Sequence, residues 1–358
     1  MHVVATGDGN APFAPLCATS LNGDAYGELI VGQPERDRVI IRLGSAAGLD
    51  AQETTVVGPA ASGFGRVMRS VGDLNDDGFS DLVLGEPSLG RIDVLRGAAL
   101  LTRLPPLNTF TASQPGFGRW VEALGDTDGD GLPDVAIGAD DAITLGYGHR
   151  AADLVLSPLE LGSGGVVGAL GGGDFDGDGL SDFWVQRRDG HLALVRGHTR
   201  GATLMPVETT LRASLADAFF ADITGDGRGE LIVPGQRYYV LGNATLLTDT
   251  TAFSLDGAPS RFGDFNGDGL TDAVIVSQAP AAVTLRPGTA QVASFGSPAT
   301  TALTGAPAAL AMSAQDFNGD GLEDLVLRTG ADTATLVVGG SAFGVRERIT
   351  PSAASQLP

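Results

Sequence analysis

Short apolar runs recur along the chain, and each comes directly after an acidic, glycine-containing stretch. The runs are three or four residues long, and helical periodicity never persists for three turns. Such runs are typical of β-strands that are buried on both faces. They comprise Leu29–Val31, Leu82–Leu84, Val135–Ile137, Phe183–Val185, Leu231–Val233, Ala273–Val276 and Leu325–Leu327.

Three further segments complete each repeating unit. A short apolar segment such as Val67–Val71 precedes the acidic stretch, a segment ending in glycine such as Ile92–Gly97 follows the apolar run, and a more polar segment such as Glu208–Leu211 comes last. Four short strands separated by turn residues suggest a meander. Units of this size repeated in a ring are the blades of a propeller.

We therefore predict an all-β fold, a seven-bladed β-propeller of four-stranded antiparallel blades. Residues 1–350 would form one propeller domain, and residues 351–358 would form a C-terminal tail. A solenoid is the alternative for any repeat, but it needs polar capping repeats, and none stands out at either end. Ring closure should pair segments from both chain ends, because an unpaired edge is a liability. Arg346–Thr350 and His2–Thr6 compete for the last outer strand.

The acidic stretch that precedes each apolar run has a defined pattern. In Asp73–Asp81, oxygen-bearing side chains occupy the first, third, fifth and ninth positions, and a glycine occupies the sixth. The alternate spacing lets a curled loop turn several oxygens inward, and glycine tolerates the sharp bend. Hard oxygen ligands in a flexible loop suit Ca²⁺, and an EF-hand loop uses the same odd positions.

The pattern recurs with starts 42 to 53 residues apart, which is the signature of a repeat architecture. Full copies begin at Asp73, Asp126, Asp174, Asp264 and Asp316. A weaker copy is Asp222–Glu230, whose third residue is the neutral Thr224. The weakest, Ser20–Glu28, has lost its first acid and its turn glycine, and we expect it to be empty.

We predict about five to six bound Ca²⁺ ions. Each would be held by side-chain oxygens at the first, third, fifth and ninth positions and by the carbonyl of the seventh residue. The candidate ligands are Asp73, Asn75, Asp77, Phe79 and Asp81; Asp126, Asp128, Asp130, Leu132 and Asp134; Asp174, Asp176, Asp178, Leu180 and Asp182; Asp222, Thr224, Asp226, Arg228 and Glu230; Asp264, Asn266, Asp268, Leu270 and Asp272; and Asp316, Asn318, Asp320, Leu322 and Asp324.

Composition narrows the classes of partner. The formal net charge of −21 argues against nucleic acid, whose phosphates would be repelled. No run is long and apolar enough to insert into a membrane. The single cysteine excludes an intrachain disulfide. No signal-like segment opens the chain, so export would require a signal that was removed or lies outside this sequence.

The chain resembles the FG-GAP repeats of the integrin α-subunit β-propeller and their bacterial relatives. The resemblance is carried by Phe64-Gly65 and Phe117-Gly118 before the loops, by altered Gly-Ala-Pro motifs such as Gly32-Gln-Pro34, and by the loops themselves. The last four units lose the first two motifs and are similar to VCBS-type repeats. The resemblance implies a seven-bladed ring, structural Ca²⁺ between the first two strands of each blade, and extracellular or cell-surface adhesion.

We read the metal as structural, since the chain shows no Gly-x-Ser-x-Gly, His-Glu-x-x-His or phosphate-loop motif. The predicted function is a non-catalytic, calcium-binding adhesion or recognition module, expected to be monomeric and not an enzyme. The alternative is a carbohydrate-binding propeller or the propeller of a polysaccharide-degrading enzyme. An unknown protein or glycan ligand would bind the face opposite the loops. That face would carry Glu35, Arg36, Glu86, Asp140, Asp141, Arg187, Arg188 and Arg237, with Trp120 near its inner rim.

Overall fold

The computed structural model of the protein describes most of the chain. The described residues fall into several ranges. These are 16–101, 107–159, 165–200, 206–215, 218–223, 225–233, 238–240, 250–251, 255, 260–289, 295–303, 312–330, 333–340 and 343–349.

The described strands form seven four-stranded antiparallel sheets, and in each sheet the strands follow one another in chain order. The first three sheets contain β1 Leu16–Thr19, β2 Glu28–Gln33, β3 Arg38–Ser45 and β4 Gly48–Val57; β5 Val67–Gly72, β6 Asp81–Glu86, β7 Arg91–Leu95 and β8 Asn108–Thr111; and β9 Trp120–Gly125, β10 Asp134–Gly138, β11 Ile143–His149 and β12 Asp153–Leu159.

The remaining four sheets repeat the same meander. They contain β13 Val166–Gly173, β14 Asp182–Arg187, β15 His191–Val195 and β16 Val207–Arg212; β17 Phe219–Ala221, β18 Glu230–Val233, β19 Tyr238–Val240 and β20 Thr250–Thr251; β21 Arg261–Gly263, β22 Asp272–Gln278, β23 Ala281–Arg286 and β24 Ala299–Ala302; and β25 Met312–Gln315, β26 Asp324–Gly330, β27 Thr333–Val338 and β28 Gly344–Ile349. Two 3₁₀ turns, η1 Pro34–Arg36 and η2 Pro87–Leu89, join second to third strands.

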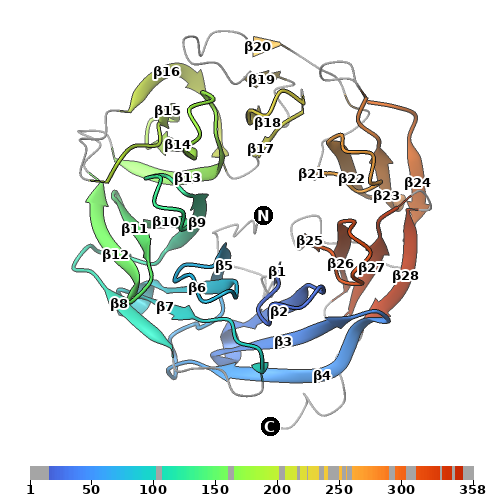
Figure 1. The fold of residues 1–358 in the computed structure, drawn as a ribbon, viewed down its shortest axis with the longest axis horizontal. Coiled ribbons are helices and arrows are strands. Elements are labelled where there is room, and N and C mark those ends of the chain that lie inside the picture. The colour runs from blue at the N-terminus through green and yellow to red at the C-terminus, as the bar shows by residue number, and fades with distance from the viewer. Residues whose placement is uncertain are drawn as a thin grey trace.

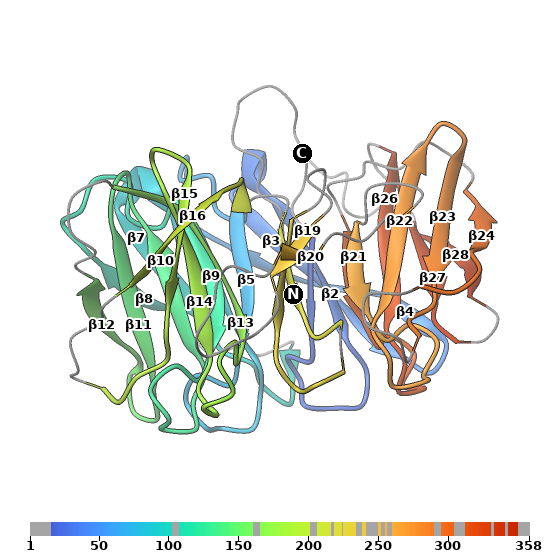
Figure 2. The same ribbon diagram turned by 90° about the horizontal axis from the view of Figure 1, so that it is seen from above.

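The sheets stand side by side in a ring, with the first strand of each sheet innermost (Figure 1). β1, β5, β9, β13, β17 and β21 contact one another in succession, and β25 contacts β1. Seen from the side, the sheets run between two faces that carry the connections (Figure 2). The predicted all-β propeller fold is confirmed.

The second strand of each sheet is buried because sheets pack against both of its faces. Every residue of β6 and of β10 is buried, whereas residues of the outer strand β8 alternate between half-buried and exposed. This gradient explains why the second strands read as unbroken apolar runs and the fourth strands as polar ones.

The hydrophobic core is divided among the interfaces between neighbouring sheets. In one interface, Ile30 and Ile41 of the first sheet pack with Leu82 and Leu84 of the second, around the fully buried Phe64. The next interface repeats the arrangement around Phe117. Each unit therefore completes its core only against its neighbour, as in other repeat architectures.

The Phe-Gly motif has a steric basis at these interfaces. Gly65 and Gly118 have φ of +86° and +85°, a region that side chains rarely adopt. A Cβ at Gly118 would lie 2.4 Å from the carbonyl oxygen of Arg91, and one at Gly65 would lie 2.9 Å from that of Arg38. Phenylalanine fills the interface, and glycine lets the chain pass against the third strand of the preceding sheet.

The first and last sheets meet directly. The N–H of Gly27 donates to the carbonyl of Asp316 at 2.7 Å, which joins the loop of the first sheet to that of the last. The outer strand of the last sheet is β28, which overlaps the predicted segment Arg346–Thr350. Each described sheet is drawn from one contiguous segment, so a sheet shared by both chain ends is not found there. The rival segment His2–Thr6 and the tail 351–358 lie outside the described residues.

Two residues predicted on the ligand face are buried instead. Glu86 is fully buried and pairs with Arg91 on the neighbouring strand β7. Arg187 is buried and pairs with Glu208 of β16, two strands away in the same sheet. The prediction placed them on the exposed face because each lies near the end of a strand, but an ion pair across the sheet holds each of these two side chains in a buried position. Arg237 lies outside the described residues.

Candidate metal centres

The acidic loops all connect the first strand of a sheet to the second. The loop of the fourth sheet, residues 174–181, runs from β13 into β14, and Asp182 is the first residue of β14. The first and ninth positions therefore lie where two neighbouring strands end and begin. This geometry brings their side chains close together although eight residues separate them.

The carboxylate of the first acid in each full loop accepts hydrogen bonds from backbone N–H groups later in the same loop. Asp174 Oδ1 accepts hydrogen bonds from the N–H groups of Gly177 and Asp178 at 2.6 and 3.1 Å, and Oδ2 accepts from Gly179 at 2.8 Å. The turn glycine Gly179 has φ of +89° and no atom within 4 Å of the place of a Cβ, so its backbone conformation rather than crowding requires glycine. Asp222, Asp264 and Asp316 accept the same bonds.

The ninth acid is fully buried and ties the loop to the third strand. Asp182 Oδ2 accepts the N–H of Phe175 at 2.8 Å, and Oδ1 accepts the N–H of Gly197, after β15, at 2.7 Å. Asp81, Asp134, Asp272 and Asp324 make the equivalent pair of bonds. The glycine that ends each third-strand segment is thus a partner of the loop.

Burial raises the pKa of these ninth carboxyls. The pKa of Asp81 rises to about 7, and those of Asp134, Asp182, Asp272 and Asp324 rise to about 6. Desolvation is the largest cause, because it disfavours the charged form, and the backbone N–H bonds oppose it. A cation beside these groups would favour their ionised form.

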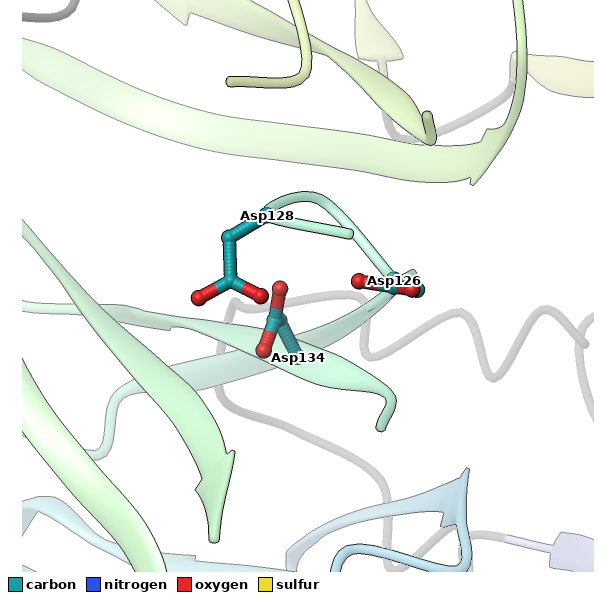
Figure 3. A group of neighbouring side chains, drawn as sticks. All are labelled: Asp126, Asp128 and Asp134. Atoms are coloured by element: carbon teal, nitrogen blue, oxygen red, sulfur yellow. The ribbon is translucent and has the colours of Figure 1, made fainter. Parts of the chain in front are cut away.

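Three loops bring three carboxylates together. Ligand atoms lie within 4.8 Å of one another in the groups Asp126–Asp128–Asp134, Asp174–Asp176–Asp182 and Asp222–Asp226–Glu230. In Figure 3 the carboxylates of Asp128 and Asp134 face each other, with Asp126 beside them. The loops beginning at Asp73, Asp264 and Asp316 have asparagine at the third position, and their described carboxylates form no such group.

The donor set fits a hard cation. Asp176 Oδ1 and Asn75 Oδ1, both at third positions, are buried and have no hydrogen-bond partner among the described residues. A buried polar oxygen without a partner is costly, and carboxylate and amide oxygens are the ligands that Ca²⁺ prefers. The residues at these loops therefore match the chemistry of a calcium site.

The fifth and seventh residues of each loop are joined by a hydrogen bond. The N–H groups of the seventh residues Phe79, Leu132, Leu180, Arg228, Leu270 and Leu322 donate to the fifth-position acids Asp77, Asp130, Asp178, Asp226, Asp268 and Asp320. Thr224 lies outside the described residues. In the weakest copy, Asn22 donates to Asp24 at 2.6 Å, and Glu28 is buried with its pKa raised to about 7, mainly by desolvation.

Each loop also binds the next sheet. In the loops beginning at Asp73, Asp126 and Asp264, the carbonyl of the second loop residue accepts an N–H from the end of the third strand of the following sheet or from just after it. Leu74 accepts from His149 at 2.8 Å, Thr127 from His198 at 2.6 Å, and Phe265 from Gly340 at 2.6 Å. Holding a loop rigid therefore also holds the interface to the next sheet.

Sequence reasoning missed Asp153, the first residue of β12. It is fully buried in the third sheet and contacts the loop of the second. Its Oδ1 accepts from Asn75 Nδ2 at 3.1 Å and pairs with Arg96 Nε at 2.7 Å, and its Oδ2 accepts from Asn108 Nδ2 at 2.8 Å. No motif marks Asp153, since its partners lie about 45 to 78 residues earlier in the chain.

Comparison with known proteins supports the resemblance. The family model of the FG-GAP-like repeat matches residues 264–327. Integrin alpha pat-2 of Caenorhabditis briggsae is 36% identical over 121 residues, which cover 30% of this chain and 10% of that protein. Integrin alpha-7 of Mus musculus is 32% identical over 177 residues, or 44% of this chain and 15% of that protein. The chain thus spans only a small part of each relative, and the predicted resemblance is confirmed.

A solved structure shares the fold at low sequence identity. The dihydro-heme d1 dehydrogenase NirN, in complex with DHE, has a TM-score of 0.56 and 13% identity, covering 92% of this chain and 64% of that one. Likeness at this identity concerns the fold alone. Within the described ranges, no helix has the length and apolar character needed to cross a membrane.

Proposed function

We propose that this integrin-like FG-GAP β-propeller is a non-catalytic recognition module whose acidic loops bind calcium. The observation that carries the proposal is a pair of buried oxygens, on Asp176 and Asn75, that lie at equivalent positions of two loops and have no hydrogen-bond partner in the described part of the chain. A solvated turn would leave such oxygens facing water. A cation among the loop oxygens would satisfy them.

The proposed ligands are the residues of the five full loops and of the loop beginning at Asp222, which gives about five to six ions. In each loop the ninth acid would bind the ion while keeping its backbone hydrogen bonds, because a carboxylate has about four lone pairs and these bonds do not use all of them. When bound, Ca²⁺ would neutralise carboxylates that otherwise repel one another at close range.

The proposed recognition surface is the face opposite the loops. It carries exposed ion pairs, including Arg119 with Asp140 at 2.9 Å and Arg188 with Asp141. Exposed pairs contribute little to stability, so these side chains are available to a protein or glycan ligand. The integrin relatives support adhesion as the class of function and the cell surface or extracellular space as the location.

Thermal melting with millimolar calcium and with excess EGTA tests the calcium part of the proposal. Calcium bound at one site would stabilise the folded protein by about 2.7 kcal/mol at a hundredfold excess over Kd. Because several sites would contribute, removing the calcium with EGTA should lower Tm by tens of degrees. Metal analysis of the folded protein should find about five to six calcium ions. Superimposed melting curves, or no more than two tightly held ions, would show that the loops are ordinary turns.

The recognition part needs a separate experiment. A screen against glycans and matrix proteins should find a ligand whose binding is weakened by Arg188→Glu on the proposed face. Asp50→Lys, placed in β4 of the first sheet, is a control for a general change of charge. Equal loss in both variants would argue against this face.

A further inference from the structure

The third position divides the loops into two kinds. It is an aspartate in the loops beginning at Asp126 and Asp174, and an asparagine in those beginning at Asp73, Asp264 and Asp316. The first, third, fifth and ninth positions therefore carry four carboxylates in the first kind of loop and three in the second. More ligand charge means tighter binding of a divalent cation, so without a compensating charge the first kind of loop would bind calcium more tightly than the second.

An arginine from the next sheet pairs with the third-position acid of the first such loop. Arg200 Nε lies 2.6 Å from Asp128 Oδ2, and Arg200 Nη2 lies 3.0 Å from Asp130 Oδ2. The guanidinium stacks 4.8 Å from the centre of the Tyr147 ring. Asp128 still brings an oxygen within 4.8 Å of those of Asp126 and Asp134, so the ion pair leaves the cluster intact.

The second such loop has an arginine that arrives by a different route. Arg196, directly after β15 in the same sheet as the loop, lies 3.3 Å from Asp176 Oδ2. The other oxygen, Oδ1, is buried and has no hydrogen-bond partner within the described ranges. Arg196 thus binds one oxygen of the third-position acid and leaves the other to a ligand.

We propose that Arg196 and Arg200 are charge-compensating residues that set the calcium affinity of these two loops. Each loop has four carboxylates and one paired guanidinium, so its net charge equals that of the three carboxylates in the loops with asparagine. The inference rests on the proposed function and makes the sites similar in strength around the ring.

One further pair follows the same rule. The loop beginning at Asp73 has an extra acid at its fourth position, Asp76, where the other full loops have glycine. Asp76 pairs with Arg150 of the next sheet at 2.8 Å. An acid added to the common pattern is again accompanied by an arginine.

The test is a calcium titration followed by the amide resonances of ¹⁵N-labelled glycine. Gly131 reports the loop that contains Asp128, and Gly179 reports the loop that contains Asp176, because both N–H groups donate to the first acid of their loop. Arg200→Gln should tighten binding at Gly131 by about tenfold and leave Gly179 unchanged. Arg196→Gln should do the reverse.

Three variants separate charge from geometry. Arg200→Lys keeps the charge and should keep the affinity at Gly131. The double variant Asp128→Asn with Arg200→Gln should return it to the wild-type value. Arg66→Gln removes an exposed arginine from the connection that precedes β5 and should change neither loop. Unchanged or weaker binding at Gly131 in Arg200→Gln would overturn the inference.

Failure of the proposed function gives a different result. The wild-type glycine resonances would then not respond to calcium, and no affinity would exist to be set. Charge compensation remains measurable by melting in EGTA. Arg200→Gln should lower Tm, and adding Asp128→Asn should restore it. If the double variant melts no higher than Arg200→Gln alone, the inference that Arg200 compensates the charge of Asp128 is wrong as well.

Discussion

Acids in the same loop have different physical roles at the scale of the residue. The ninth acid is fully buried and accepts backbone N–H groups from the loop and from the third-strand segment, so it holds the loop together without any cation. The fifth acid is more exposed and accepts the N–H of the seventh residue, as Asp178 does from Leu180 at 2.9 Å. Replacing the ninth acid and replacing the fifth acid should therefore change the free energy of unfolding by different amounts.

We expect Asp182→Ala to destabilise the protein even in EGTA. The N–H groups of Phe175, Asp176 and Gly197 lose their acceptor, at a cost of about 3 kcal/mol in the free energy of unfolding. Asp178→Ala is the matched control and should cost under about 1 kcal/mol in EGTA while reducing the gain from calcium. Urea unfolding with and without calcium measures both. Equal losses in EGTA would contradict the assigned roles.

Stability should also depend on pH through the ninth acids. Burial raises the pKa of Asp182 to about 6 in the folded protein, whereas an exposed aspartate has a pKa of 3.8. The protonated form of Asp182 therefore stabilises the calcium-free protein fully below pH 3.8, and this contribution is lost as the pH rises through 6.

Calcium should reverse this trend, because it competes with the protons. We expect the increase in Tm caused by calcium to become larger between about pH 5 and about pH 7.5. Over the same range, deprotonation of the ninth acids should lower the Tm of the calcium-free protein in EGTA. Melting at several pH values measures both. Asp182→Asn should reduce the pH dependence. A calcium effect that is constant over this range would show that these acids do not bind the ion.

At the scale of the element, each unit depends on its neighbour. The core residues of one sheet are completed by those of the next, with Phe64 and Phe117 at two interfaces. Gly65 and Gly118 allow the close approach that positions these rings. The loops add polar contacts at the same interfaces through carbonyls such as those of Leu74 and Thr127.

Gly118→Ala tests the interface. A Cβ there would lie 2.4 Å from the carbonyl oxygen of Arg91 in a left-handed backbone conformation, and we expect a loss of about 3 kcal/mol. Gly131→Ala has the same φ of +85° but no atom within 4 Å of the new Cβ, so backbone strain alone applies, at about 1 kcal/mol. Equilibrium unfolding compares the two. If the two variants lose the same free energy of unfolding, steric contact at Gly118 does not contribute.

At the scale of the whole molecule, the ring is closed by the first and last sheets. β1 contacts β25, and the N–H of Gly27 donates to the carbonyl of Asp316 in the last loop. The loop of the last sheet is therefore part of the closure, whereas the loop of the first sheet lacks the first acid of the pattern.

We expect Asp320→Ala to loosen the closure in the presence of calcium. The last loop would lose a ligand, and hydrogen exchange at the amide of Gly27 should become at least several-fold faster, because local opening determines the rate. Asp24→Ala, in the first loop, should change it less although it lies closer to Gly27 in sequence. The reverse order would indicate that the first loop controls the closure.

The sequence by itself determined the repeat, the strands and the loops. Apolar runs after acidic loops at a nearly fixed period are local patterns, and strand burial and turn chemistry follow from them. The first and ninth acids of each loop could also be assigned from spacing, because the strands on either side of the loop fix their separation.

Tertiary structure decided what lies beside each loop. Asp153 and Arg200 reach their loops from the following sheet, and Glu86 and Arg187 turn inward to ion pairs across strands. These contacts join residues 5 to 78 positions apart with no shared motif. Which side chain meets which across an interface depends on the packing of whole sheets, which a one-dimensional pattern does not contain.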